Sequence, residues 1–221
     1  PASTLSLRIE MDGYAPLFLN DANPSQQFSN VPSSISDFFG AEQEAFSLVP
    51  EEDVPAEMVY VPAGPFVPAI VGSPVAAVLV RAFAVDRSEV SNLEFKEFVD
   101  AGGYSERSLW ADLEFNLDGE MLDWEDASAL MVDATGQPGP ATWEFGSYKP
   151  GTDDHPVTGI SWYEARAYAR FQGKSLPTIT HWLRAAYPPS EISSSLMPSL
   201  VGTSNFDREA LHPVGSEQGG G

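Results

Sequence analysis

Two S-x-x-E sequences, each followed by apolar residues at helical spacing, constrain the fold of this chain more than any other feature. In each, a serine (Ser91 or Ser161) can cap a helix, and the glutamate three residues later can accept a hydrogen bond from the serine N–H. Both segments run into glycine, at 102–103 and at Gly173, where helices commonly end. The sequence therefore predicts two short capped helices, and Ser161 is assigned a structural role.

A third short helix is predicted over 179–186, because Pro177 and Thr178 precede it and two prolines follow it. Trp162 in the second helix and Trp182 in the third lie at helical spacing with alanine and leucine. Large aromatic rings at such positions usually pack into the core. We therefore expect both rings to be buried, and we assign Pro177, Thr178 and Trp162 to holding the fold.

Short strands are predicted before and between these helices. Apolar and polar residues alternate over 4–19 on both sides of Asp12-Gly13, which predicts a hairpin. Further strands are predicted at 58–62, at 78–85 and at 155–160. The chain therefore combines a few short strands with a few short helices.

The domain organisation follows from shifts in composition. Residues 1–20 are interpreted as the end of a small upstream β domain, and 21–56, rich in Asn, Ser, Pro and acidic residues, as a linker. Residues 57–221 are predicted to form one domain. Within it, 105–136 is acidic and weakly periodic, so we expect a surface excursion outside the core, with a short helix at 124–131.

The composition excludes several classes of partner and chemistry. The 221 residues include 32 acidic and 11 basic side chains, a formal net charge of -21 at pH 7. Nucleic acid and anionic lipid would therefore be repelled. The absence of cysteine removes disulfides, thiolate nucleophiles and thiolate metal ligands from these residues. It fixes no compartment, since a cysteine-free chain fits either side of a membrane.

Four motifs in a fixed order carry a family resemblance. The sequence reads M-V-Y-V-P-A-G-P-F at 58–66, D-R-S-E-V-S-N at 86–92, H-P-V-T-G-I-S-W-Y-E-A at 155–165 and G-K-S-L-P-T at 173–178. These resemble the M-V-x-V-P-G-G-x-F, D-R-x-E-V-T-N, H-P-V-x-x-V-S-W-x-D-A and G-K-R-L-P-T motifs of the formylglycine-generating enzyme, or sulfatase-modifying factor, family. Several motifs in the correct order are more specific than one short match.

This resemblance implies a single α+β domain of the C-type-lectin-like kind, with little regular structure and long loops. The family would continue beyond 212–216 into a further core segment, so the domain is predicted to be incomplete at its C-terminus. A narrower likeness, to members fused to bacterial Ser/Thr protein kinases, lies in 136–144 and in 175–178 together with the His181-Trp182 pair. The N-terminal hairpin also resembles the last hairpin of a small β domain that can precede the module in such proteins.

The resemblance also states which chemistry to look for. The family's enzymes oxidise a sulfatase cysteine with a copper ion held by two cysteines, and this chain has none. Some relatives use a histidine-ligated iron, which requires clustered imidazoles. Here His155, His181 and His212 stand far apart in the sequence, and no two share the i, i+4 spacing that places ligands on one helix face. We therefore predict no catalytic residue and no bound redox cofactor in this chain.

Five residues remain as candidates for binding or for structure. The resemblance implies calcium at Asn205, after the third helix; the alternative is a turn residue bonding to its own backbone. Glu89 and Asn92 flank a helix start and are predicted to satisfy free backbone N–H groups rather than to act in catalysis. Trp143 and Tyr148 lie in a loop between glycine and proline residues, and are the candidates for a ligand groove.

The leading interpretation is a non-catalytic ligand-recognition or scaffold module of formylglycine-generating-enzyme type, with the sensor part of a bacterial Ser/Thr protein kinase as one form of that role. Its partners would be a protein, peptide or glycan ligand and a kinase domain in the same chain. One alternative is a metal-dependent oxidoreductase whose active site lies in further C-terminal sequence. The other is a calcium-dependent lectin-like binding domain.

Overall fold

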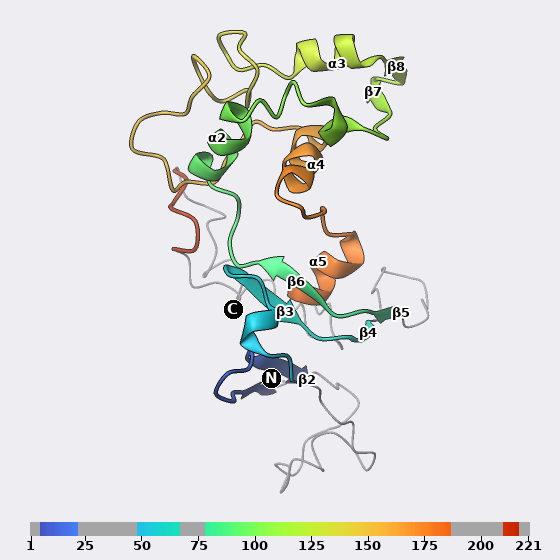
Figure 1. The fold of residues 1–221 in the computed structure, drawn as a ribbon, viewed down its shortest axis with the longest axis vertical. Coiled ribbons are helices and arrows are strands. Elements are labelled where there is room, and N and C mark those ends of the chain that lie inside the picture. The colour runs from blue at the N-terminus through green and yellow to red at the C-terminus, as the bar shows by residue number, and fades with distance from the viewer. Residues whose placement is uncertain (1–4, 22–47, 67–77, 187–209, 217–221) are drawn as a thin grey trace, which may run out of the picture. The chain divides into compact units, whose positions relative to one another are not determined.

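A computed structural model describes residues 5–21, 48–66, 78–186 and 210–216 (Figure 1). The chain divides into two compact units. The first consists of Pro1–Arg87 with Pro177–Met197, and the second of Ser88–Leu176 with Pro198–Gly221. No helix in the described ranges is long and apolar enough to cross a membrane. Short strands and short helices occur together, and among the described residues no sheet closes on itself, so the fold class is α+β.

The first unit contains three antiparallel strand pairs. β1 (Leu5–Ile9) pairs with β2 (Leu17–Asp21), β3 (Met58–Val61) with β6 (Phe83–Asp86), and β4 (Gly64–Phe66) with β5 (Val78–Val80). The first pair is the predicted hairpin, and Gly13 in its connection has a φ of 80°, which glycine adopts without steric cost. A 3-10 helix, η1 (Glu51–Asp53), precedes β3.

The first unit also includes the predicted third helix, α5 (Ile179–Ala186). Thr178 Oγ1 accepts a hydrogen bond from the His181 N–H at 3.3 Å, which satisfies one free donor of the first turn. The His181 ring lies edge-on to Phe83 with centroids 4.8 Å apart. Trp182, expected in the core, is instead 56% exposed. His181 faces β6, and Trp182 is the next residue in the helix. One residue corresponds to a rotation of about 100° around the helix axis, so the Trp182 side chain points away from β6.

In the second unit, both predicted capping boxes are present. Ser91 precedes α2 (Asn92–Asp100) and Ser161 precedes α4 (Trp162–Phe171). The Ser91 and Ser161 N–H groups donate to the glutamates three residues later at 2.8 and 2.6 Å, and each serine Oγ accepts the glutamate N–H in return. After α4, the Lys174 N–H donates to the Ala169 carbonyl at 2.7 Å, with Gly173 at a φ of 68°. This is the C-terminal arrangement that a helix-ending glycine favours.

The buried face of α4 does not include Trp162, which was predicted to belong to it. Trp162 is 59% exposed, whereas Glu164, Ala167 and Tyr168 are buried. These three residues follow the i, i+3, i+4 pattern of one helix face, and Trp162 lies about 200° around the axis from Glu164. The expectation that Trp162 anchors the core is therefore wrong. Its ring contacts Tyr163 and the Arg166 guanidinium instead.

The buried carboxylate of Glu164 has a partner from the loop after α2. Tyr104 Oη donates to Glu164 Oε1 at 2.6 Å, while Glu164 Oε2 accepts the Ser161 N–H. Burial and the neighbouring carboxylate raise the pKa of Tyr104 well above its usual value. The phenol therefore remains a donor at any physiological pH, and the pair joins the start of α4 to the core.

The core of the second unit draws on the segment expected to be a surface excursion. η2 (Arg107–Trp110), β7 (Phe115–Leu117), β8 (Glu120–Leu122) and α3 (Trp124–Leu130) follow one another there. Their buried residues join those of α2 and α4 in one cluster that contains Phe95, Phe98, Tyr104, Trp110, Phe115, Ala127, Met131, Trp143, Ala167 and Tyr168. The prediction that 105–136 lies outside the core is therefore wrong. Its buried aromatic residues are single and widely spaced, so they leave no periodic pattern in the sequence.

The predicted strand at 155–160 is also absent. Only one bridge forms there, between Ser91 and Pro156, followed by a hydrogen bond from the Val157 N–H to the Val90 carbonyl at 2.9 Å. Proline has no N–H to continue a ladder, and Gly159 has a φ of 74° that leaves the strand conformation. The segment is an extended loop that leads into α4.

Candidate functional site

A long loop of the second unit, residues 133–155, contains a connected set of polar contacts and is named here the 133–155 loop. It starts at Asp133, whose side chain is only 4% exposed. One carboxylate oxygen, Oδ1, accepts bonds from the Thr135 N–H at 2.7 Å, the Thr135 hydroxyl at 2.8 Å and the Gln137 N–H at 2.9 Å. The other, Oδ2, accepts the Gly146 N–H at 2.7 Å. Asp133 thus ties the start of the loop to a turn 13 residues further along.

The charge of Asp133 is stabilised by these donors. Burial by itself raises the pKa of the carboxyl, but the hydrogen bonds from Gly146, Gln137 and Thr135 outweigh it and lower the pKa to about 2. The carboxylate is therefore ionised throughout the physiological range. Four donors from the loop bind this carboxylate, so its role is to organise the loop.

The turn held by Asp133 presents an aromatic side chain to solvent. Glu144 and Ser147 exchange backbone hydrogen bonds at 2.9 and 3.1 Å, which closes a two-residue turn over Phe145 and Gly146. Phe145 has a φ of 55° and is 81% exposed. Its N–H donates to Thr135 Oγ1 at 2.8 Å. The sequence analysis did not single out this residue; the signal was the E-F-G-S sequence, in which glycine marks a tight turn.

Trp143, predicted to line a ligand groove, lies in the core instead. It is 2% exposed, and its Nε1–H donates to the Asn92 side-chain oxygen at 3.0 Å. The amide nitrogen of Asn92 donates in turn to the Thr152 carbonyl at 2.9 Å. The prediction for Trp143 is corrected, because an indole satisfied in this way and enclosed by Phe95 and Tyr148 has no free face.

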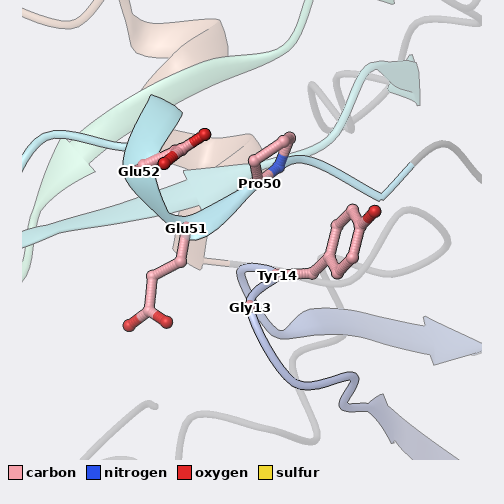
Figure 2. A pocket seen from close by; sticks show the side chains of 5 residues that line it. All are labelled: Gly13, Tyr14, Pro50, Glu51 and Glu52. Carbon is pink, nitrogen blue, oxygen red and sulfur yellow. The ribbon is translucent and has the colours of Figure 1, made fainter.

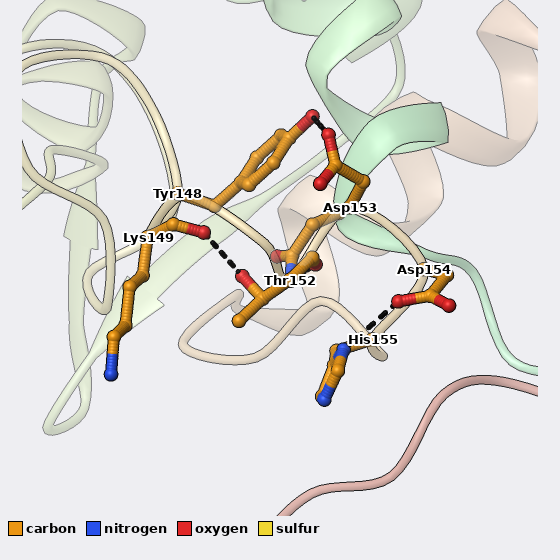
Figure 3. A network of polar contacts seen from close by, with 7 residues as sticks. Tyr148, Lys149, Thr152, Asp153, Asp154 and His155 are labelled. Atoms are coloured by element: carbon orange, nitrogen blue, oxygen red, sulfur yellow. Dashed lines mark hydrogen bonds and ion pairs between the residues drawn. The ribbon is translucent and has the colours of Figure 1, made fainter.

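Tyr148, the other groove candidate, is half-buried and packs its ring edge-on against Trp143, with centroids 5.3 Å apart. Its hydroxyl donates to Asp153 Oδ1 at 3.0 Å (Figure 3). Burial, followed by the hydrogen bond to Asp153, raises the pKa of the Tyr148 phenol. Figure 3 also shows Asp154 bonded to the His155 ring, with Nδ1 3.1 Å from the carboxylate. This end of the loop is a set of satisfied local pairs.

The backbone of the same loop caps α2. The Asn92 and Leu93 N–H groups donate to the carbonyls of His155 and Asp153 at 2.8 and 2.9 Å. Asn92 was predicted to satisfy such donors with its side chain, but that side chain joins Trp143 to Thr152. Glu89 is exposed, and in the described part of the chain its carboxylate has no hydrogen bond or ion pair. The carbonyls of His155 and Asp153, rather than the Glu89 side chain, accept the free N–H groups at the start of α2.

The remaining predicted residues divide between the units. Ser161 caps α4 in the second unit, and Thr178 lies before α5 in the first, next to the exposed Pro177. Asn205, the calcium candidate, lies outside the described residues. The structure therefore brings Asn92, Trp143 and Tyr148 together in the second unit.

The first unit has a shallow hollow of about 540 Å3 between the N-terminal hairpin and η1 (Figure 2). Its lining consists of Gly13, Tyr14, Pro50, Glu51 and Glu52. The Ala15 and Glu51 N–H groups bond to the Val49 and Gly13 carbonyls at 2.9 and 3.0 Å, which joins the hairpin to this segment. The sequence analysis missed this contact, because it treated the intervening residues as a linker.

The metals that the family uses do not fit the residues present. No cysteine occurs in the sequence. Within the described ranges, no three His, Asp or Glu side chains lie close enough to share a metal ion. Neither a thiolate copper site nor a histidine-ligated iron site can be assembled from these side chains.

Comparison with known proteins defines the class of this α+β chain. The profile of the sulfatase-modifying factor enzyme 1-like domain matches residues 43–193. The chain therefore belongs to this family.

Three relatives are enzymes by name. The formylglycine-generating enzyme of Bos taurus is 32% identical over 180 residues, which cover 72% of this chain and 48% of the relative. Hercynine oxygenase of Mycolicibacterium thermoresistibile is 32% identical over 147 residues, 64% of this chain and 31% of the relative. The formylglycine-generating enzyme of Mycobacterium tuberculosis is 36% identical over 132 residues, 52% of this chain and 44% of the relative. The chain thus spans about a third to a half of these relatives.

We expect Asp133→Asn to lower the melting midpoint by about 5 to 10 °C at neutral pH, because the amide is neutral and directs a donor at one of the backbone N–H groups. The folded pKa of about 2 lies below the ordinary value of about 3.9. Asp133 therefore stabilises the fold above about pH 4, and this contribution is lost as the pH falls towards about 2. Melting curves of both proteins from pH 7 to pH 2 should converge in acid. A constant difference across that range would contradict the assignment.

Proposed function

We propose that these residues act as a non-catalytic ligand-recognition or scaffold module of the sulfatase-modifying-factor type. The observation that carries the proposal is the absence of cysteine from the 221 residues. Oxidation of a sulfatase cysteine in this family depends on copper held by two thiolates, and a chain without cysteine cannot supply that pair. What remains is a loop-rich α+β scaffold with a rigid, exposed turn.

Two finer proposals belong to this interpretation. The first is that the family domain has a C-type-lectin-like arrangement, which the two-stranded ribbons and the long 133–155 loop support. The second is that the module is the sensor part of a bacterial Ser/Thr protein kinase, with a protein, peptide or glycan as its ligand. The likeness of 136–144 and His181-Trp182 to kinase-fused members supports it. The sequence that flanks this stretch in the whole protein tests it, since a kinase domain upstream is required.

The names of the relatives favour a second candidate function. Formylglycine-generating enzymes and hercynine oxygenases match this chain over less than half of their own length. The whole protein would then be a metal-dependent oxidoreductase whose metal ligands lie outside these 221 residues. Two cysteines about five residues apart in further C-terminal sequence would be its signature.

We expect the chain to take no Cu(I) from a chromophoric chelator of moderate affinity, because it has no thiolate to compete for the ion. The colour of the copper–chelator complex, recorded as protein is added under anaerobic, reducing conditions, measures the transfer. A formylglycine-generating enzyme with its cysteines intact is the positive control. Removal of one equivalent of copper by the chain would contradict the proposal, and the same result with only the whole protein would assign the metal site to the flanking sequence.

A further inference from the structure

The aromatic side chain of Phe145 is the most exposed of the large apolar groups that the structure describes in the 133–155 loop. It is 81% exposed, between a buried Trp143 and a half-buried Tyr148. Its φ of 55° lies in the left-handed region, which Gly and Asn adopt far more readily than an aromatic residue. The chain thus accepts two unfavourable features at one residue, exposed apolar area and backbone strain.

The turn that carries Phe145 is fixed from several directions. The Phe145 N–H is held by Thr135 Oγ1 at 2.8 Å and the Gly146 N–H by Asp133 Oδ2 at 2.7 Å. The same Thr135 hydroxyl donates to Asp133 Oδ1 at 2.8 Å. The N–H groups of Phe145 and Gly146 are therefore both held by Thr135 and Asp133, which are hydrogen-bonded to each other. Strained residues persist where the surroundings over-determine them, and they concentrate at binding sites. A side chain on such a turn loses little conformational freedom when it is bound.

From these observations we infer that Phe145 is a pre-organised anchor that inserts into an apolar pocket of a protein partner with a basic rim. A two-residue turn is convex, so its tip fits a concave surface. The net charge of -21 on the chain repels nucleic acid, anionic lipid and a second copy of the chain itself. Glu144, exposed beside the tip, would face the partner's Lys or Arg side chains. Single aromatic residues of this kind often dominate an interface.

This inference rests on the proposed recognition role and names the residue through which the module would bind. The two can fail separately. Copper transfer to the chain, and oxidation of a sulfatase-motif cysteine peptide to formylglycine by the chain, are both independent of Phe145. If Phe145 has no partner while neither copper transfer nor peptide oxidation is detected, the anchor is wrong and the non-catalytic role stands.

The test begins with a photo-crosslinking phenylalanine analogue at position 145 in the whole protein, produced in the organism that makes it. The same analogue at Leu130, an equally apolar residue on α3 that is 59% exposed, is the matched control. We expect irradiation to attach one basic protein at position 145 and none at position 130. Adducts only within the same polypeptide, adducts to lipid or nucleic acid, or no adduct at position 145 would each overturn the inference.

Binding to the purified partner then measures the anchor. Phe145→Asn, which suits the left-handed turn and preserves the fold, should weaken binding at least about 30-fold, whereas Phe145→Tyr should stay within about threefold. Leu130→Asn should leave the affinity unchanged. The melting midpoint of Phe145→Asn should equal or exceed that of the parent. A Phe145→Asn protein that binds as well as the parent would overturn the inference. So would a Phe145→Asn protein that unfolds at lower temperature, because the ring would then be an internal contact.

Discussion

Replacing Trp143 by alanine should lower the free energy of unfolding by about 4 to 6 kcal/mol, much of the stability of an ordinary domain. The indole is 2% exposed and contacts Phe95 and Tyr148, so its removal leaves a large cavity. The change also leaves the Asn92 side-chain oxygen without its indole donor, which adds the cost of an unpaired buried acceptor. Urea denaturation followed by circular dichroism measures the difference.

The chain provides its own control for this prediction. Trp162→Ala removes the same side chain from a position that is 59% exposed, and we expect it to cost less than about 1 kcal/mol. Trp143→Phe, which keeps most of the apolar volume, should fall between the two. Equal costs at 143 and 162 would show that Trp143 is not part of the core.

Gly159→Ala is expected to cost about 2 to 4 kcal/mol, from backbone strain together with a steric clash. Gly159 has a φ of 74°, and a Cβ at this position would lie 2.8 Å from both the backbone nitrogen and Cγ2 of Thr142. Relief of the clash requires the segment that contains Gly159 to move away from Thr142. That movement would break the bond from the Ala141 N–H to the Gly159 carbonyl, now 2.8 Å.

Gly151→Ala separates the two causes. Gly151 has a similar φ of 80°, but a Cβ there would meet no atom within 4 Å. It should therefore show the strain alone, about 1 to 2 kcal/mol. If the two alanine variants are equally stable, the close approach of Gly159 to Thr142 is absent in solution.

Local sequence patterns predicted the local features of this fold well. The capping boxes at Ser91 and Ser161 depend on residues three positions apart, so a sequence carries all the necessary information. The face that α4 buries depends on what packs against it. Glu164 is buried because Tyr104 from a distant loop donates to it, and a sequence pattern that assigns charged residues to the surface predicts the opposite.

The candidate site, too, could be predicted only as far as it depends on local sequence. Composition identified the Gly- and Pro-rich loop that contains Trp143 and Tyr148 as the segment to examine for recognition. Which aromatic residue it exposes was decided by partners remote in sequence: Asn92 accepts from Trp143, and Asp133 holds Gly146. Long-range hydrogen bonds of this kind have no period or spacing in a single sequence. The E-F-G-S sequence marks the turn, but the exposure of Phe145 follows only from the structure.

Oxidation of a cysteine peptide tests the non-catalytic role most directly. A peptide carrying a sulfatase motif is incubated with the chain, copper, oxygen and a reductant, and mass spectrometry measures conversion of its cysteine to formylglycine. The bovine formylglycine-generating enzyme, which is 32% identical over 180 residues, serves as the positive control. Because the chain has no thiolate to bind copper, we predict no conversion above that in a chain-free mixture. Formylglycine that increases in proportion to the concentration of the chain would contradict the account.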